Sequence, residues 1–340
     1  MACLLTTIPP ELRDDIIERV LLYERPAPSD ISSEHPNREH APAEAILNAK
    51  KGSASRVRLE RSTPTCNAAG LVCASHQLAS ETRAVANRLK LVYKLDLLLV
   101  HETWLWPTWT CLPLPADRIE HMHVTIRLLA RPPAQHKVGL LSSYRGPPAL
   151  MWALYFLLES GLTRGFAFRD QPGRPSRPIC VQNLTLDFVE RGYKFDPIQI
   201  RAFITRDPTA RVDHAYDAWV LNQYRPRPLP TAEPMRIHWF ARIVRPYIDL
   251  VVRDPWNYKW SAVVHQRVGS VVIAICGQTM YTLDVADVLA TLRAKHHFTD
   301  VLEGFLPMLR AYMVETLALR AKRGLPVPAT TRVLDGVGNT

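Results

Sequence analysis

Two histidines at alternate positions are the first candidates for chemistry in this sequence. His121 and His123 fall in a stretch whose apolar and polar residues alternate, so a strand would place both imidazoles on one face, as paired metal ligands would be. A zinc site needs further Cys or His ligands at a characteristic spacing, and none follows here. We therefore predict that the pair occupies polar positions on the outer face of a strand, and we expect no metal or other cofactor.

Other side chains that commonly act in catalysis lack the partners they would need. Cys73 precedes His76 by three residues, but a nucleophile requires a base that a third group orients, and no such group is recognisable. His296 and His297 are adjacent, so on a helix their side chains diverge. The sequence has only 14 glycines and contains no G-x-G-x-x-G, G-x-x-x-x-G-K-[ST], G-x-S-x-G or H-E-x-x-H motif. We expect a protein that is not an enzyme, in which Cys73 packs against apolar neighbours.

Three tryptophans, Trp104, Trp106 and Trp109, stand close together in a Pro-containing segment that we read as a loop over residues 101–118. Aromatic side chains among basic residues can stack on nucleic-acid bases. Here Arg118 is the only close basic residue, so we expect the tryptophans to pack in the core or as a lid, with a partner-binding surface as the alternative.

The chain is basic, with a net charge of +10 at pH 7 and 340 residues. A basic balance favours acidic partners, nucleic acid included. The arginines are scattered, however, and no block of five or six consecutive basic residues occurs. The sequence therefore predicts a solvated basic surface and no specific nucleic-acid binding.

Hydropathy and cysteine usage indicate the compartment. No run approaches the roughly 20 apolar residues that a membrane helix requires. The apolar start of the chain has no basic residue before it, unlike a secretory signal, and none of the six cysteines forms a C-x-x-C pair. We expect an intracellular protein, cytoplasmic or nuclear, with reduced thiols and no membrane contact.

Apolar periodicity divides the chain into helices and strands that do not alternate regularly, which disfavours a doubly wound parallel sheet. Pro10 and Glu11 open the first helix, and a second helix is expected at about 68–89. Alternation predicts strands over 91–99, 119–129 and 184–188, and two or three short strands over 263–283. Further helices are expected over 149–160 (ended by Gly161), 216–223, 235–244 (limited by Pro246), 284–292 (capped by Asp284) and 299–323.

The predicted fold class is α+β. We expect a helical segment formed by residues 1–24 and 66–90, interrupted by a mobile insertion over 25–65 that is rich in Pro, Ser, Ala, Glu and Arg. A mixed body of antiparallel strands and helices follows over 91–324 and ends in a long helix, and residues 325–340 form a disordered tail.

The N-terminal pattern resembles a known family. Ile8-Pro9-Pro10-Glu11-Leu12-Arg13, followed by Ile16, Val20 and Leu21, is similar to the opening helix of F-box and F-box-like domains. In many fungal proteins of this kind a segment like Leu71-Val72-Cys73-Ala74-Ser75-His76-Gln77-Leu78 comes later, and strands follow it. The resemblance covers residues 4 to about 129.

The resemblance implies a function. The helical segment of an F-box protein docks on the adaptor subunit of a cullin–RING ubiquitin ligase, and the rest of the chain captures a protein substrate. By resemblance the adaptor contacts would be Pro9, Leu12, Ile16, Val20 and Leu21, with Leu71 and Val72 secondary. These apolar anchors on one helix face would act by helix-in-groove binding.

The spacing leaves alternatives open. About 50 residues separate the two halves of the pattern, and the tryptophan usual after the Val-Cys pair is missing near His76. The same Leu/Ile stripe could instead be the core of an F-box-derived structural or binding domain with no ubiquitin role. A basic nucleic-acid-associated protein is a further alternative.

Overall fold

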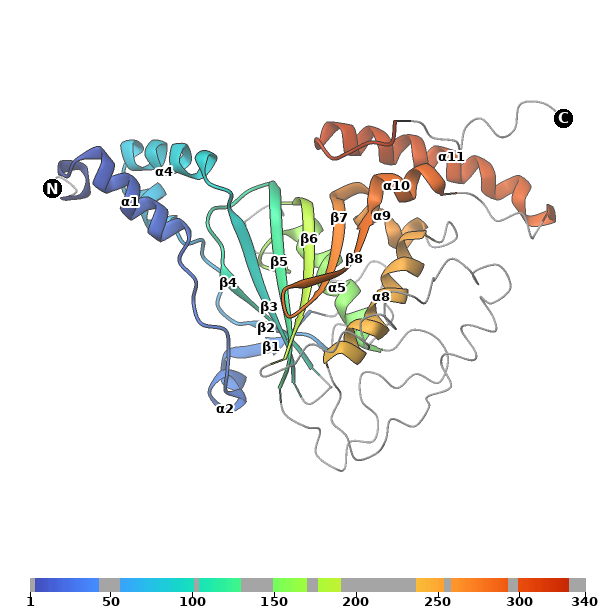
Figure 1. The fold of residues 1–340 in the computed structure, drawn as a ribbon, viewed down its shortest axis with the longest axis horizontal. Helices are drawn as coiled ribbons and strands as arrows, with labels where there is room; N and C mark the ends of the chain where they lie inside the picture. Colours follow the sequence, from blue (N-terminus) through green and yellow to red (C-terminus); the bar gives the residue numbers. More distant parts are fainter. Residues whose placement is uncertain are drawn as a thin grey trace.

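The computed structural model of the chain describes residues 4–42, 56–100, 104–129, 149–169, 177–190, 237–253, 258–292 and 299–329. A six-stranded sheet stands at the centre, with helices packed on it and a helical unit at the N-terminal side (Figure 1). The predicted α+β class is confirmed. A 3-10 turn, η1 (Leu4–Thr7), precedes the first helix.

The strand order in the sheet is β4-β3-β5-β6-β7-β8. The four central strands β3, β5, β6 and β7 run parallel, and only the outer strands β4 and β8 are antiparallel to their neighbours. The expectation of antiparallel strands is therefore wrong for the centre of the sheet. The bounds are β3 (Val92–Val100), β4 (Trp104–Cys111), β5 (Arg118–Leu129), β6 (Cys180–Val189), β7 (Val268–Ile275) and β8 (Gln278–Asp284).

Crossover helices explain the parallel pairing. The chain leaves β5 and returns to β6 through α5 (Ala149–Arg164), and it passes from β6 to β7 through α8 (Ile237–Arg253) and α9 (Tyr258–Arg267). Two of these helices are longer than expected: α5 continues through Gly161, and α8 continues through Pro246. Packing on the sheet overrides the local preference of both residues to end a helix.

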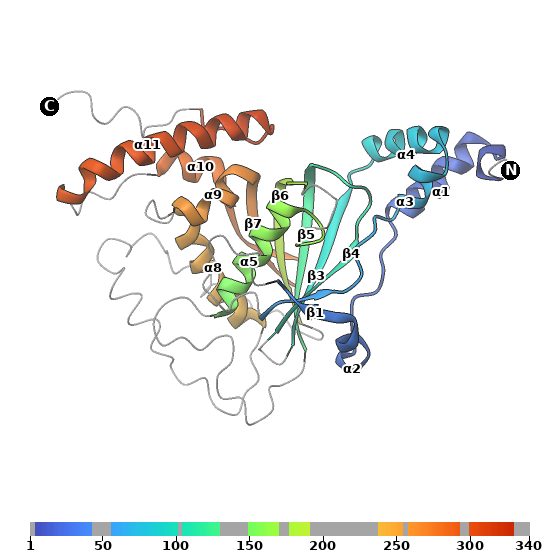
Figure 2. The ribbon, with the colours of Figure 1, turned by 180° about the vertical axis from the view of Figure 1, so that it is seen from behind.

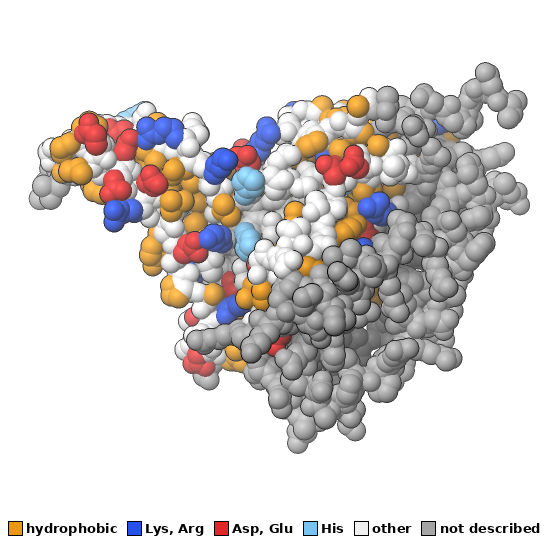
Figure 3. Space-filling model, in the orientation of Figure 1, with side chains coloured by type: hydrophobic (Ala, Val, Ile, Leu, Met, Phe, Trp, Pro, Cys, Tyr) orange, Lys and Arg blue, Asp and Glu red, His pale blue; other side chains and the backbone are white. Residues whose placement is uncertain are grey.

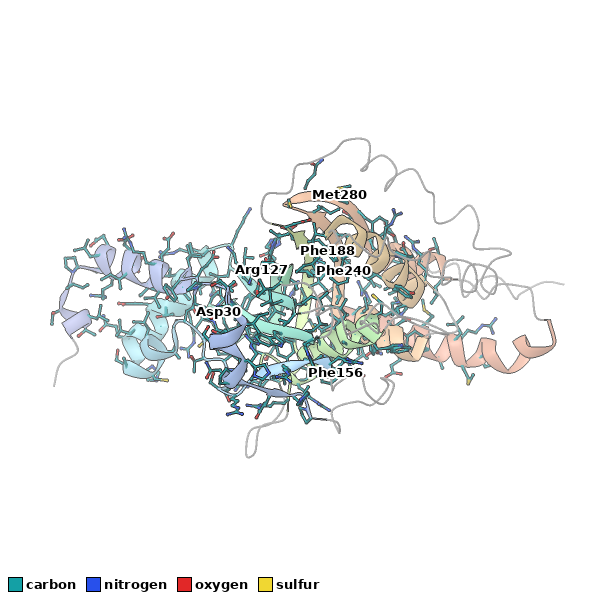
Figure 4. All side chains as sticks on the ribbon, turned by 90° about the horizontal axis from the view of Figure 1, so that it is seen from below. Asp30, Arg127, Phe156, Phe188, Phe240 and Met280 are labelled. Atoms are coloured by element: carbon teal, nitrogen blue, oxygen red, sulfur yellow. The ribbon has the colours of Figure 1, made fainter. Side chains whose placement is uncertain are left out.

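One face of the sheet carries the main core. α5, α8 and α9 lie on this face (Figure 2), and their apolar residues join those of the strands in one cluster. Phe156 of α5, Phe188 of β6 and Phe240 of α8 are all fully buried there (Figure 4). The Phe188 and Phe240 rings meet edge to face with centroids 5.3 Å apart, a geometry that favours aromatic pairs.

The N-terminal helical unit consists of α1 (Pro10–Leu21), α3 (Ala69–Ala74) and α4 (His76–Arg88). The single helix expected at 68–89 is divided at Ser75, whose backbone is extended and whose Oγ accepts a 3.2 Å hydrogen bond from the Leu78 N–H. Ser75 is thus the N-cap of α4. The unit has its own small cluster of buried residues, separate from the sheet core: Ile17, Leu21, Ala68, Val85 and Ala86.

The described parts of the expected mobile insertion are folded. They form α2 (Ile31–Glu34), the 3-10 turn η2 (His35–Asn37) and an antiparallel pair of strands, β1 (Arg38–His40) and β2 (Arg58–Glu60). Val57 and Leu59 are buried in the main core, and Arg38 Nη1 donates to the Pro107 carbonyl at 2.9 Å. The prediction was wrong here because a few well-placed residues anchor a segment of low apolar content. Residues 43–55 lie outside the described part.

The tryptophan-rich segment is a strand, and the loop expected at 101–118 is wrong for residues 104–111. Leu105 and Trp109 face the main core, and Trp109 Nε1 donates to the Phe166 carbonyl at 2.8 Å. Trp106 faces the opposite side with Leu98 and Val100. Pro107 is tolerated because β4 is an outer strand of the sheet.

The two helices predicted near the C-terminus, at 284–292 and 299–323, are present. Asp284 Oδ1 accepts hydrogen bonds from the N–H groups of Ala286 and Asp287, so it caps α10 (Val285–Thr291) as expected. The long last helix is α11 (Thr299–Lys322). The expected tail begins as packed chain, since Leu325 is buried. Residues 330–340 and the helix expected at 216–223 lie outside the described residues, within which no helix is long and apolar enough to cross a membrane.

Candidate functional site

Helix α1 is fixed to α4 along one side. Pro10 stands in the first turn, where a missing N–H costs nothing, and Glu11 there suits the helix dipole. Ile17 and Leu21 are one helical turn apart, both almost fully buried, and they pack with Val85 of α4. These anchors hold α1 in place.

Two ion pairs flank the apolar contact. Arg13 Nε and Nη2 donate to the two Glu81 carboxylate oxygens at 2.9 and 2.7 Å, and Arg88 Nη2 donates to Asp14 Oδ2 at 2.7 Å. The Arg13 guanidinium lowers the pKa of the Glu81 carboxyl, chiefly through this hydrogen bonding. Arg13 therefore joins the two segments that the sequence separates by almost 70 residues.

The other side of α1 is exposed and carries apolar residues. Pro9 and Leu12 are exposed, with Leu12 at 57% of its full accessible area, and Ile16 is half-buried. Because the spacings are three and four residues, all three lie on one helix face. Leu22 and Tyr23, which the sequence reasoning did not single out, extend the exposed apolar surface past the end of the helix.

The remaining predicted contact residues differ in accessibility. Val20, Leu71 and Val72 are half-buried, and Val20 and Leu71 pack against the small cluster. Leu21 is fully buried, so its prediction as a partner contact is wrong. Successive side chains of an α-helix are about 100° apart around its axis. Leu21 therefore lies on the same side of α1 as Ile17 and faces α4. Ile17 was missed, although its four-residue spacing to Leu21 could have identified it.

A second candidate site lies on the face of the sheet opposite the main core. Strand β5 points His121, His123, Thr125 and Arg127 to this face, next to Lys94 and Asp96 of β3 and to Asn183, Thr185 and Asp187 of β6. Parallel sheets normally bury apolar residues on both faces. Figure 3 shows histidine and charged side chains exposed on this side of the molecule, next to the helical unit.

This face of the sheet is apolar where a helix packs on it and polar where no described long helix does. Where α2 lies against it, Ile31 packs with Leu98, Val100 and Trp106, and the face is apolar. In the described residues no long helix covers the rest, where the side chains are polar. The prediction that His121 and His123 are polar positions on the outer strand face is thus confirmed.

Residues 24–28, the link between α1 and α2, cross the polar face beside a cleft of about 540 Å³. The Arg25 N–H donates to the Thr110 carbonyl at 2.9 Å, and Arg127 Nη2 donates to the Pro28 carbonyl at 2.8 Å. Lys94 forms an ion pair with Glu24. The side chains lining the cleft are Glu24, Arg25, Pro26, Ala27, Val92, Lys94, Asp96, Thr110, His123, Thr125 and Arg127.

No protein-family model, curated protein or solved structure matches this chain. The resemblance of its N-terminus to F-box-like domains therefore remains an expectation from the sequence.

The ionised groups in the cleft are mostly paired. Asp96 accepts from Arg127 Nε at 2.6 Å and from Arg127 Nη2 at 2.8 Å. His123 Nε2 lies 3.6 Å from Asp187 Oδ2, and the other carboxylate oxygen of Asp187 accepts the Gly277 N–H at 3.0 Å. Partial burial lowers the pKa of His123 more than Asp187 raises it, so this imidazole is neutral at neutral pH.

The other sequence candidates are not assembled into a site. Cys73 is exposed, so the expectation that it packs in an apolar environment is wrong. His296 and His297 lie outside the described residues. Within the described part of the chain, no three or more His, Cys, Asp or Glu side chains come close enough to hold a metal ion.

Proposed function

We propose that this chain is a non-enzymatic, F-box-like protein-interaction protein, in which the exposed face of α1 binds the adaptor subunit of a cullin–RING ubiquitin ligase. The observation that supports this proposal is the exposure of Leu12 on a helix that other residues already hold in place. A large apolar side chain on the free face of a fixed helix is the usual anchor of helix-in-groove recognition.

The energetics favour a partner at this face. Burying an exposed leucine side chain contributes about 1.5–3 kcal/mol. Pro9 and Ile16, on the same face, would add apolar contact without any change in the fold, because Ile17, Val20 and Leu21 are the α1 residues that pack in the small cluster. Residues of the sheet body would then capture a protein substrate. The alternative is an F-box-derived binding domain with no ubiquitin role.

Calorimetric titration of the full chain with the purified adaptor tests the proposal. We expect Leu12→Asp and Ile16→Asp each to abolish measurable binding while the far-UV circular dichroism and the unfolding midpoint stay close to wild type. Ala84→Asp is the matched control: it places the same charge at an exposed position of α4 and should bind normally.

Ile17→Asp calibrates the experiment, since a carboxylate at this buried position should prevent soluble expression. If Leu12→Asp and Ile16→Asp behave like Ile17→Asp, the face belongs to the core and adaptor binding is refuted. If wild type and Ala84→Asp fail to bind although both are folded, the F-box-derived alternative replaces it.

A further inference from the structure

The polar cleft is lined by charged side chains of both signs. Its lining contains three cationic side chains, Arg25, Lys94 and Arg127, and two anionic ones, Glu24 and Asp96. Each cation has a carboxylate partner: Lys94 pairs with Glu24, Arg127 pairs with Asp96, and Arg25 pairs with Glu60 beside the lining. The volume of the cleft, about 540 Å³, is in the range of sites that hold a small ligand or a few peptide residues.

Three side chains that line the cleft, Lys94, Thr125 and Arg127, carry hydrogen-bond donors that are not all in use. Lys94 uses one of its three donors on Glu24, and Nη1 of Arg127 makes no hydrogen bond within the described residues. The hydroxyl of Thr125 likewise has no hydrogen-bond partner in that part of the chain. By contrast, both carboxylate oxygens of Asp96 are already occupied by Arg127. Lys94, Thr125 and Arg127 therefore offer hydrogen-bond donors to a ligand that carries acceptor atoms.

The Glu24 carboxylate is held in the cleft by a weak interaction, its exposed ion pair with Lys94. The side chains of Lys94 and Glu24 are 36% and 50% exposed, and ion pairs at such exposure contribute little. The segment that carries Glu24 is held separately, through the Arg25 N–H to Thr110 and the Pro28 carbonyl to Arg127. The Glu24 carboxylate can therefore leave Lys94 without moving the segment.

We propose that this cleft binds a carboxylate side chain from an acidic peptide segment of a partner protein, and that Glu24 occupies the place of that carboxylate in the free protein. Recognition of acidic motifs by grouped Lys and Arg side chains is an established mode of peptide binding. The net charge of +10 on the whole chain would draw an acidic segment toward the molecule. The site is independent of adaptor binding, because it uses none of the exposed residues of α1.

An acidic peptide fits the cleft better than a nucleic acid. Among the described residues, no Phe, Tyr or Trp side chain lines the cleft, so bases would find no aromatic surface there on which to stack. Two of the three cations, Arg25 and Arg127, are engaged with Glu60 and Asp96 and are poorly placed to neutralise successive phosphates.

The test is fluorescence anisotropy with the full chain and two labelled ten-residue peptides, one alternating Glu and Gly and the other alternating Gln and Gly. We expect the Glu peptide to bind about tenfold more tightly, since charge-assisted hydrogen bonds are roughly twice as strong as neutral ones. A single-stranded oligonucleotide of equal charge is the third probe, and it should bind more weakly than the Glu peptide.

Two variants and one control locate the site. Lys94→Gln should weaken binding of the Glu peptide about tenfold, whereas Glu24→Gln should strengthen it about two- to fivefold by removing the competing carboxylate. Lys322→Gln removes the same charge from an exposed position on the distant helix α11 and should leave binding unchanged.

The proposal is overturned if the Glu and Gln peptides bind equally, if Lys94→Gln and Lys322→Gln weaken binding equally, or if the oligonucleotide binds more tightly than the peptide. Should Lys94→Gln fail to fold, Glu24→Gln still decides, because an unchanged or reduced affinity for the Glu peptide contradicts the role given to Glu24.

Discussion

The helical unit and the sheet body are held together by cores of very different size. The hydrophobic cluster of the unit consists of five buried residues from α1, the N-cap of α3 and α4. The main core draws buried residues from all six strands of the large sheet and from α5, α8, α9, α10 and α11. Ion pairs beside this cluster also join the helices of the unit, such as the pair between Arg13 of α1 and Glu81 of α4. The body instead buries Arg320, which donates to the carbonyls of His265, Val268 and Pro326.

Because the two cores differ in size, they leave different surfaces free for binding. A small core leaves most of the surface of α1 unused, so Leu12 and Ile16 are available to a partner. The large core leaves one sheet face uncovered by any long described helix, and there the strands carry polar side chains. In both regions the candidate site is the surface that packing does not require.

The largest effect is expected in the main core. Phe188→Ala removes a fully buried ring that packs against Phe240, and it should lower the free energy of unfolding by about 3–5 kcal/mol. Urea unfolding followed by circular dichroism measures this. Phe188→Leu, which keeps most of the volume, is the control and should cost less. A loss below about 1 kcal/mol for Phe188→Ala would mean that the core relaxes around the site.

Acid should weaken the same body through His265. This imidazole is completely buried between α9, α8 and α11: Nε2 donates to the Val252 carbonyl and Nδ1 accepts from the Tyr312 hydroxyl. Desolvation lowers the pKa of His265 from 6.5 to about 4, so the folded state binds its proton less readily than the unfolded state. Its stabilisation is complete above pH 6.5 and is lost as the pH falls toward 4, by about 3 kcal/mol in total.

Urea unfolding at pH 7 and pH 4.5 tests this, with His265→Gln as the comparison. The variant should lose less stability between the two pH values than wild type. Equal losses would show that other groups account for the acid sensitivity and that His265 is not held in its neutral form.

A smaller and more local effect is expected in the helical unit. Ile17→Ala removes an anchor from a cluster that can partly collapse around it, and it should cost about 2 kcal/mol. Hydrogen exchange should show faster exchange for amides of α1 and α4, while amides of β5 and β6 keep wild-type protection. If the strand amides exchange faster by the same factor, the unit and the body unfold together, which would contradict separate cores.

The sequence predicted those parts of the fold that short-range patterns determine. Strict alternation over 119–129 gave β5 and the outward direction of His121 and His123, and Asp284 marked the start of α10. Strand pairing was missed, because an alternating pattern does not show whether the next strand is parallel. Pro107 concealed β4, since its tolerance depends on a position at the outer edge of the sheet.

The candidate sites were predictable to different degrees. The spacing of Pro9, Leu12 and Ile16 gave the exposed face of α1, whereas Leu21 was assigned to that face although it turns toward α4. The polar cleft could not be predicted, because Glu24, Lys94 and Arg127 come from segments that only the tertiary fold brings together.

The most direct test of the central claim is affinity purification of the full chain from cells, followed by mass spectrometry. Wild type and the double variant Leu12→Asp/Ile16→Asp would be compared at matched expression. If the exposed face of α1 is a partner surface, the adaptor and the cullin should co-purify with wild type and be absent from the variant. Adaptor recovery with neither protein, or equal recovery with both, would contradict it.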